Sequence, residues 1–296
     1  MFDLRYHVAS LAAVFFALVI GILVGVALAS HGLGNAERST LKRQVAAEQT
    51  ALDAANAQLG ALSDEGRADK AFVDTVYPAI MKDRLRRRRI AVLYVGSASG
   101  RLVQAIDETL RDAGAPPVAR MRAVTVPVRF PGVERTLENR PQLASYAGSD
   151  QIGELGRALG HELAGGGETP LWSALARQLV EQQEGGQAPA DGVIVARTAG
   201  PQKRGTALFL SGLYAGLVES GLPVVGVELT DAEVSAVRAY HRSGMSSVDD
   251  VETPQGRLAL ALLLAGTGSG DYGVKATAKG KILPEPVQPV TTPPGG

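Results

Sequence analysis

Few side chains in this sequence could bind a metal ion. Cysteine is absent, and there are only four histidines and four methionines, so thiolate metal sites, disulfides and a cysteine nucleophile are excluded. His241 and Met245 are four residues apart and could share one face of a helix, where they would offer two ligands to a soft metal such as copper. Two ligands alone make a poor copper site, and a surface histidine is the simpler interpretation.

A second group with metal-binding chemistry is acidic. Asp249, Asp250 and Glu252 lie close together in the sequence, and their carboxylates suit a hard cation. Thr253 followed by Pro254 is also typical of a helix start, with a threonine N-cap and a proline at the first helical position. We therefore prefer the interpretation that this acidic segment caps a helix, and a metal site stays an open alternative.

No pattern in the sequence is typical of an enzyme. No serine lies in a Gly-x-Ser-x-Gly motif, and no pair of carboxylates stands out by its spacing. The loop Gly96–Gly100 follows a predicted strand, where α/β proteins bind phosphates, but it lacks the GxGxxG spacing and a Walker lysine. A tight turn is the preferred interpretation, and we expect neither catalysis nor a cofactor. Nucleic-acid binding is not expected either, because 30 basic and 30 acidic side chains balance.

The first element that could position these residues is apolar. From Val8 to Ala29 no residue is charged, and a helix of that length spans about 33 Å, the thickness of a bilayer's hydrocarbon core. We predict a membrane-spanning helix over residues 8–29, within an anchor of residues 1–35. Ala27–Ala29 resembles a signal-peptidase site, but the apolar run is longer than a signal-peptide core, so an uncleaved anchor is preferred. Small residues recur at every fourth position and could let two such helices approach closely: Ala17, Gly21, Gly25 and Ala29.

A heptad pattern follows the apolar segment and predicts a coiled-coil stalk over residues 36–85. Its apolar columns are spaced by three and four residues, which keeps a narrow stripe facing a partner helix. The residues that we expect to form a homodimer contact are Leu41, Val45, Leu52, Leu59 and Leu62. Glu48, Gly66 and Asp69 interrupt the columns, and residues 63–66 could form a hinge. An amphipathic helix folded back on its own domain is the alternative.

Alternating strand and helix patterns predict an α/β domain over residues 86–270. Apolar, β-branched runs separated by helical patterns are typical of a mainly parallel sheet of the Rossmann or flavodoxin kind. The predicted strands are residues 90–95, 118–126, 193–196 and 224–227, and the predicted helices are residues 100–110, 152–163, 171–182, 208–220 and 254–264. The arginines at 86–89 suit a solvated strand edge or, alternatively, contact with an anionic partner. Residues 271–296, rich in proline and glycine, predict a disordered tail.

Segments near both ends of the sequence resemble a known family. Asp3–His7 running into Ser10–Phe15 and Gly21–Gly25, and later Ser247–Leu260 with Gly270–Gly273, are similar to the opening and closing patterns of the actinobacterial copper transporter family typified by mycobacterial copper transport protein B. The resemblance implies a single-pass protein of the cell membrane, with the stalk and the α/β domain outside the cytoplasm and a role in copper transport or homeostasis. The count of lysines and arginines beside the apolar segment weakly favours the opposite orientation.

Two hypotheses about function follow from the sequence. In the first, the chain is a membrane-anchored, dimeric envelope protein that influences copper export or tolerance. In the second, it is an envelope scaffold whose coiled coil binds and regulates a cell-wall or cell-division partner, since long helices with exposed apolar stripes are suited to partner binding. The sequence contains no obvious set of copper ligands, so copper enters only through the resemblance.

Overall fold

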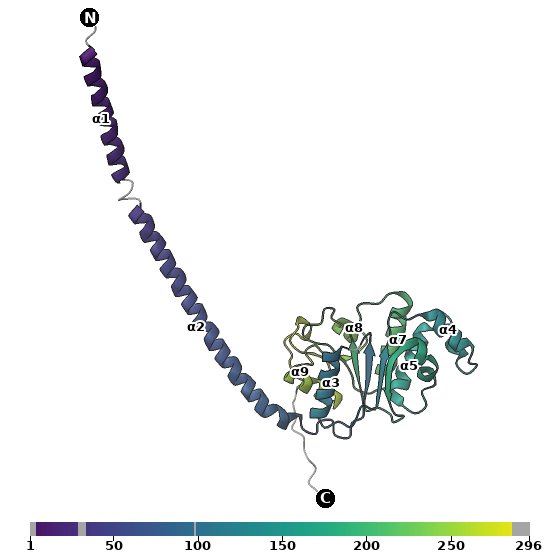
Figure 1. The fold of residues 1–296 in the computed structure, drawn as a ribbon. Helices are drawn as coiled ribbons and strands as arrows, with labels where there is room; N and C mark the ends of the chain where they lie inside the picture. The colour runs from purple at the N-terminus through teal and green to yellow at the C-terminus, as the bar shows by residue number, and fades with distance from the viewer. Residues whose placement is uncertain (1–3, 29–33, 98, 286–296) are drawn as a thin grey trace. The chain divides into compact units, whose positions relative to one another are not determined.

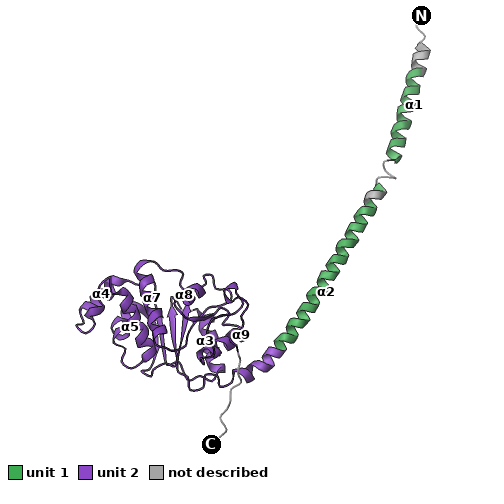
Figure 2. Ribbon diagram, turned by 180° about the vertical axis from the view of Figure 1, so that it is seen from behind, with its two compact units in different colours: residues 1–71 green, residues 72–296 purple. Residues whose placement is uncertain are grey.

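Two compact units, residues 1–71 and 72–296, make up the fold of this computed structural model (Figure 2). The residues that the structure describes are 4–28, 34–97 and 99–285. The first unit holds α1 (Leu4–Leu28) and most of α2 (Gly34–Met81), and the second holds the end of α2 and an α/β domain. The predicted fold class is confirmed, with an N-terminal apolar helix, a long helix and a mainly parallel sheet.

The long helix α2 is unbroken from Gly34 to Met81. Residues 63–66, where the sequence suggested a hinge, are helical, since a single glycine in a helix interior costs only about 1 kcal/mol. The helix ends before residue 85, the predicted end of the stalk. Met81 and Leu85 are both fully buried in the core of the second unit, and the Leu85 amide donates to the Ala113 carbonyl oxygen (2.9 Å). The last residues of the predicted stalk therefore belong to the α/β domain.

A seven-stranded sheet in the order β3-β2-β1-β4-β5-β6-β7 forms the centre of the α/β domain. Neighbouring strands are parallel except for β2 and β3, which run antiparallel. The strands are β1 (Ile90–Val95), β2 (Arg120–Val124), β3 (Val180–Gly185), β4 (Gly192–Arg197), β5 (Val224–Val227), β6 (Ser246–Val248) and β7 (Asp271–Tyr272). Every residue of β1 and β5 is buried, as expected for parallel strands that are covered on both faces.

Helices cover both faces of the sheet, as Figure 1 shows. On one face α3 and α9 pack with the end of α2, and on the other α4, α5, α6, α7 and α8 form a second layer. These helices are α3 (Gly100–Asp112), α4 (Phe130–Glu138), α5 (Ile152–Gly165), α6 (Pro170–Leu179), α7 (Arg204–Glu219), α8 (Val237–Arg242) and α9 (Pro254–Leu264), with short 3-10 helices at Ala144–Tyr146 and Ala276–Ala278. Two hydrophobic cores result, one on each side of the sheet.

The edge strand β3 corrects one helix prediction. Residues 171–182 were predicted to be helical, but α6 ends at Leu179 and the chain continues as β3. The residues after Val180 in this strand are polar and exposed, so hydrophobic periodicity gave no strand signal. Gly185 closes the pairing with a φ of 105°, and a Cβ there would lie 2.4 Å from the Ala119 carbonyl oxygen. Pairing with β2 therefore decides the structure of this segment.

The ordered domain also extends beyond its predicted end at residue 270. Strand β7 pairs with β6, and Ala278 is buried, so the prediction of a disordered tail is wrong for residues 271–285. The physical reason lies partly in Asp249, whose carboxylate accepts hydrogen bonds from the amides of Val274 and Lys275 (2.9 and 3.2 Å). Residues 286–296 of the predicted tail lie outside the described residues.

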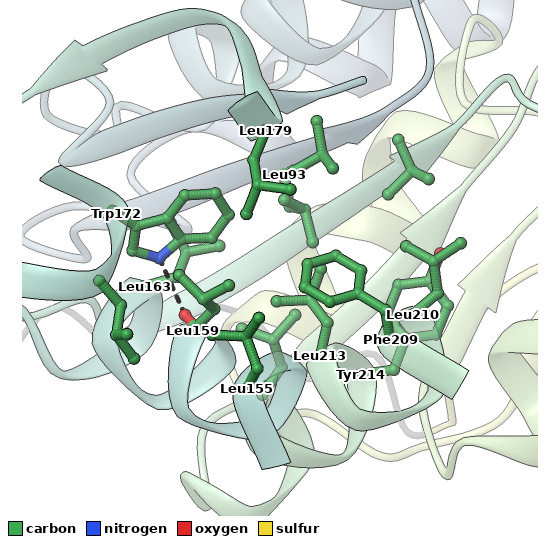
Figure 3. Close-up of a cluster of buried hydrophobic side chains, with 14 of the residues drawn as sticks. Leu93, Leu155, Leu159, Leu163, Trp172, Leu179, Phe209, Leu210, Leu213 and Tyr214 are labelled. Carbon is green, nitrogen blue, oxygen red and sulfur yellow. Dashed lines mark hydrogen bonds between the residues drawn. The ribbon is translucent and has the colours of Figure 1, made fainter. Parts of the chain in front are cut away.

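Trp172 belongs to the core on the side of α5, α6 and α7, where it packs among leucines (Figure 3). The side chain is fully buried, and its Nε1 donates a hydrogen bond to the Leu159 carbonyl oxygen (2.9 Å). Because the one polar atom of the ring is satisfied, its burial carries no unpaired donor.

Glycines bring α5 and α7 into backbone contact beside this core. A Cβ added at Gly212 of α7 would lie 2.0 Å from the Gly153 carbonyl oxygen, and one added at Gly156 of α5 would lie 2.2 Å from that of Phe209. Both opposing atoms belong to backbone, which cannot move aside as the end of a side chain can. The two helices can therefore approach this closely only with glycine at these positions.

Gly212→Ala should destabilise the protein by about 1–3 kcal/mol, because the new methyl group forces the two helix backbones apart. Gly165→Ala is the matched control at the end of α5, where an added Cβ meets no atom within 4 Å. The control should be neutral or stabilising by up to about 1 kcal/mol, as alanine is the better helix former. Thermal unfolding of the purified chain in detergent measures both changes, and equal stability of the two variants would contradict the backbone contact.

Candidate functional site

Helix α1 contains a segment, Ser10–Leu28, that is long and apolar enough to cross a membrane, with a mean hydropathy of 2.9. None of it is buried inside the protein, and large side chains such as Phe15, Phe16 and Leu23 are 64–69% exposed. A helix that is apolar on every side differs from a surface helix, which hides one apolar face against a core. The predicted span of residues 8–29 corresponds closely to this segment, except that Ala29 lies outside the described residues.

The predicted stripe of small residues is open within the single chain. A Cβ added at Gly21 or Gly25 would meet no atom within 4 Å, and Ala17 is exposed on the same helix. Ala29, the fourth member of the stripe, lies outside the described residues. Contact between two such helices is not tested by the structure of one chain and stays a prediction.

The apolar residues of the predicted coiled coil are likewise exposed. The five residues have 57–64% of their surface accessible: Leu41, Val45, Leu52, Leu59 and Leu62. Within the second unit, the last turns of the helix pack on the α/β domain: Tyr77 and Ile80 lie against the core, and the Tyr77 hydroxyl donates to Asp112 (3.0 Å). Burial, together with Asp112, raises the pKa of Tyr77, so the hydroxyl keeps its proton. Whether the rest of α2 folds back on the domain is not tested, because the two units are described separately.

The structure does not bring His241 and Met245 together on one helix face. Helix α8 ends at Arg242, before Met245. Met245 is 4% exposed and belongs to the hydrophobic core, whereas the His241 side chain is 74% exposed and its Nδ1 lies 3.1 Å from an oxygen of Asp271. The sequence interpretation of a surface histidine fits this arrangement.

The acidic segment before α9 forms hydrogen bonds with neighbouring parts of its own chain. Thr253 is the N-cap of α9, and its Oγ1 accepts a hydrogen bond from the Gly256 amide (3.0 Å), as the capping interpretation expected. Asp249 holds the segment after β7, and the Thr277 hydroxyl also donates to its carboxylate (3.2 Å). The Asp250 carboxylate accepts from Thr253 Oγ1 (3.0 Å), while its Oδ1 is buried without a hydrogen-bond partner in the described structure. Within the described ranges, no group of three or more His, Asp or Glu side chains is arranged to hold a metal ion.

The turn after β1 is tight, as the sequence suggested. Gly96 has a φ of 93°, and an added Cβ would lie within 3.0 Å of Thr198 and Ala199. The Thr198 hydroxyl donates to the Ser97 carbonyl oxygen (2.7 Å), which fixes the turn against the end of β4. Ser99 is the N-cap residue of α3 without a side-chain cap.

The arginines at 86–89 have different environments. Arg86, Arg87 and Arg88 are exposed, whereas Arg89 donates to Asp191 through its backbone amide, Nε and Nη2 (2.8, 3.0 and 3.1 Å). These hydrogen bonds lower the pKa of Asp191 and join the starts of β1 and β4. Arg89 thus has a structural partner, and the alternative of an anionic partner for the others is not tested.

Sequence analysis missed the role of Glu228. Its side chain is 2% exposed and accepts hydrogen bonds from the Ala236 amide (2.7 Å), the Ser235 hydroxyl (2.8 Å) and the Lys275 ammonium group (2.6 Å). It therefore joins the start of α8 to the segment that follows β7. The signal was an acidic residue directly after an apolar strand, where a buried carboxylate needs donors from elsewhere in the chain.

Comparison with known families gives one finding for nearly the whole chain. A family model described as copper transport outer membrane protein, MctB, matches residues 1–283. The match includes the apolar helix, the long helix and every strand of the α/β domain. No curated protein matches the chain.

Asp250 should make the stability of the protein depend on pH. Burial raises the pKa of its carboxyl above the ordinary value, so the folded state favours the neutral acid and loses stability as the pH rises and the group ionises. Asp250→Asn cannot ionise, and its melting temperature should rise relative to the unmodified chain on going from about pH 4 to about pH 7. Glu168→Gln, which replaces an exposed carboxylate, is the control and should leave this difference near zero. A parallel pH dependence in all three proteins would contradict the assignment.

Proposed function

The chain belongs to the MctB family of copper transport outer membrane proteins, and from this membership we propose that it serves copper transport or homeostasis in the cell envelope as a membrane-anchored homodimer. The observation that carries the proposal is the extent of the match, residues 1–283. Because the match includes the apolar helix as well as the α/β domain, membrane association and the copper role are inferred for one intact protein.

Copper in this proposal is cargo and not a resident cofactor. The chain has no cysteine, and the described His, Asp and Glu side chains form no group able to hold a metal ion. Copper(I) prefers thiolate, thioether and imidazole ligands. Of the two candidate ligands, Met245 is buried in the core and His241 lies on α8, which ends before Met245. The proposal therefore includes no fixed copper site in the α/β domain and no enzymatic activity. The chain would act on copper through assembly with other copies or with a partner.

The homodimer is supported by the exposed apolar surfaces of the first unit. Leucines and valine at heptad positions of α2 are more than half exposed, and each large side chain buried in a coiled coil would contribute about 1.5–3 kcal/mol. In α1, the open face at Gly21 and Gly25 would let two backbones approach within the lipid, where small residues favour helix contact. Both surfaces lie in the first unit, whose described residues form no hydrophobic core of their own.

The proposal also includes the orientation of the chain in the membrane. The anchor is uncleaved, spans the membrane once, and leaves the stalk and the α/β domain outside the cytoplasm. Support for this orientation comes from the family resemblance, because the basic residues after the apolar segment favour the other side only weakly.

Cells that lack the gene should accumulate a different amount of copper and grow differently in added copper, and the full-length chain should restore both. Leu18→Arg places a charge near the middle of the apolar segment, at a cost of about 2.5–3.5 kcal/mol on insertion scales. This variant should move from the membrane to the soluble fraction and fail to restore copper tolerance.

Leu18→Ala is the matched control, since it keeps the segment apolar, and it should restore tolerance. Copper content is measured in whole cells, and immunoblots of membrane and soluble fractions follow the protein. An unchanged copper phenotype in the deletion strain would refute the copper role, whatever the location of the protein.

The double variant Leu52→Glu, Leu59→Glu should dissociate the dimer, because it places four like charges in the apolar stripe of two paired helices. The matched control is Thr50→Glu, Ala57→Glu, which adds the same charges at outer positions of the heptad. Light scattering of the full-length chain in detergent should give a dimer for the unmodified chain and the control, and a monomer for the stripe variant. A monomer for the unmodified chain would refute the homodimer and leave the stripe free for another envelope protein.

A further inference from the structure

A pocket of about 510 Å³ opens between the loop after β4, helix α7 and helix α8. Its polar lining includes Arg197, Ser211, Tyr214, Arg238 and Arg242. A volume of this size is typical of sites for small molecules and exceeds what a few ordered waters fill. The pocket lies at the carboxyl end of β4, beside the point where the strand order reverses between β1 and β4, which is where open α/β sheets bind ligands.

Arg197 is the last residue of β4 and points toward the side of α7 and α8. Its Nε donates to the Ala199 carbonyl oxygen (2.8 Å) and its Nη2 to that of Gly200 (2.6 Å). These bonds fix the guanidinium without neutralising it, because both acceptors are uncharged. A half-buried positive charge is thus held in place at the pocket, next to the Tyr214 side chain.

Tyr214 of α7 provides a second donor at the same place. The residue is 3% exposed and lies at the edge of the hydrophobic core beside Leu210 (Figure 3). Its hydroxyl is buried and has no hydrogen-bond partner in the described structure. Burial raises the pKa of Tyr214 to about 12, although the nearby Arg197 opposes the change, so the hydroxyl keeps its proton at neutral pH. A buried hydroxyl without a partner costs free energy unless a ligand supplies an acceptor.

The rest of the pocket adds positive charge and no negative charge. Arg238 and Arg242 lie on exposed positions of α8, and none of the described residues that line the pocket is an aspartate or a glutamate. Glu228, near the start of α8, already accepts hydrogen bonds from Ser235, Ala236 and Lys275. The field in the pocket therefore attracts anions and repels free metal cations.

A close contact between α8 and the sheet fixes the strand end that carries Arg197. The Tyr240 ring lies against Gly226 of β5, where an added Cβ would be 2.2 Å from its Cδ2. This contact lets the Tyr240 hydroxyl accept a hydrogen bond from the Arg197 backbone amide (2.8 Å). The end of β4 is thereby fixed from the side of α8, so the Arg197 side chain starts from a rigid position.

We propose that this pocket binds a small organic anion, whose carboxylate or phosphate oxygens accept hydrogen bonds from the Arg197 guanidinium and the Tyr214 hydroxyl. The guanidinium has the planar donor geometry that suits either group. Apolar lining residues, among them Pro201, Leu210 and Val234, contact the uncharged part of the ligand. The site goes beyond the copper role and does not depend on it.

Calorimetric titration of the purified full-length chain in non-ionic detergent tests the site. The anionic probes are benzoate and phenyl phosphate, which distinguish the carboxylate from the phosphate, and the neutral probe is benzamide, which has nearly the shape of benzoate. At least one anion should bind with one-to-one stoichiometry, and benzamide should bind at least about tenfold more weakly, because it lacks the charge that Arg197 recognises.

Tyr214→Phe should weaken binding of that anion about three- to tenfold, and Arg197→Gln at least about tenfold. Arg140→Gln, which replaces an exposed arginine on another part of the surface, should leave Kd unchanged. Tyr214→Phe removes an oxygen that has no partner, so this variant should fold even if Arg197→Gln, which loses two backbone contacts, does not. The proposal is overturned by absence of saturable binding for both anions, by equal affinity for benzamide, or by an unchanged Kd in Tyr214→Phe. Copper tolerance of Tyr214→Phe cells is a separate readout, so failure of the copper role and failure of the site are distinguishable.

Discussion

Burial of the central strands on both faces is the constraint on which the second unit depends. Because β1, β4 and β5 carry apolar side chains on both faces of the sheet, helices have to cover both faces to keep them from water. Parallel strands joined by helices then gather all their following loops at one edge of the sheet. The first polar side chains after the strands meet there: Arg197 ends β4, Glu228 follows β5 and Asp249 follows β6. Burial of the strands therefore determines where these polar side chains lie.

The first unit has the opposite character, since its described apolar residues are not buried within that unit. The segment Ser10–Leu28 of α1 is apolar all round and exposed, and the apolar heptad residues of α2 are exposed as well. Isolated helices in water gain little from propensity alone, so both depend on surroundings that the chain does not supply. Lipid suits α1 and a second helix suits the narrower stripe of α2. Membership of a family of membrane-associated copper transport proteins gives this part of the chain a consistent role.

The sequence predicted the structure where a signal is local and strong, but not where strand pairing determines the structure. The apolar helix, the long helix, the buried strands and the N-cap at Thr253 were predictable, because periodicity and capping chemistry act within a few residues. Strand β3 is polar, and β6 and β7 are too short to show a period, so only pairing in the fold reveals them. Met245 was a candidate ligand by spacing, but the end of α8 and burial in the core separate it from His241. Arg197 and Tyr214 come from two elements, and no spacing in the sequence predicts that both line one pocket.

The pocket of the α/β domain is poorly suited to bind copper directly. The pocket presents arginine side chains and a tyrosine hydroxyl, none of which is a ligand for copper(I), and its positive field opposes a free cation. Any effect of the pocket on copper handling therefore has to pass through its anion, by a change in the affinity of the chain for another copy or a partner. Such coupling is reciprocal, so assembly would change the affinity for the anion by the same factor. Control of assembly is therefore the route that we propose for an effect of the folded domain on copper.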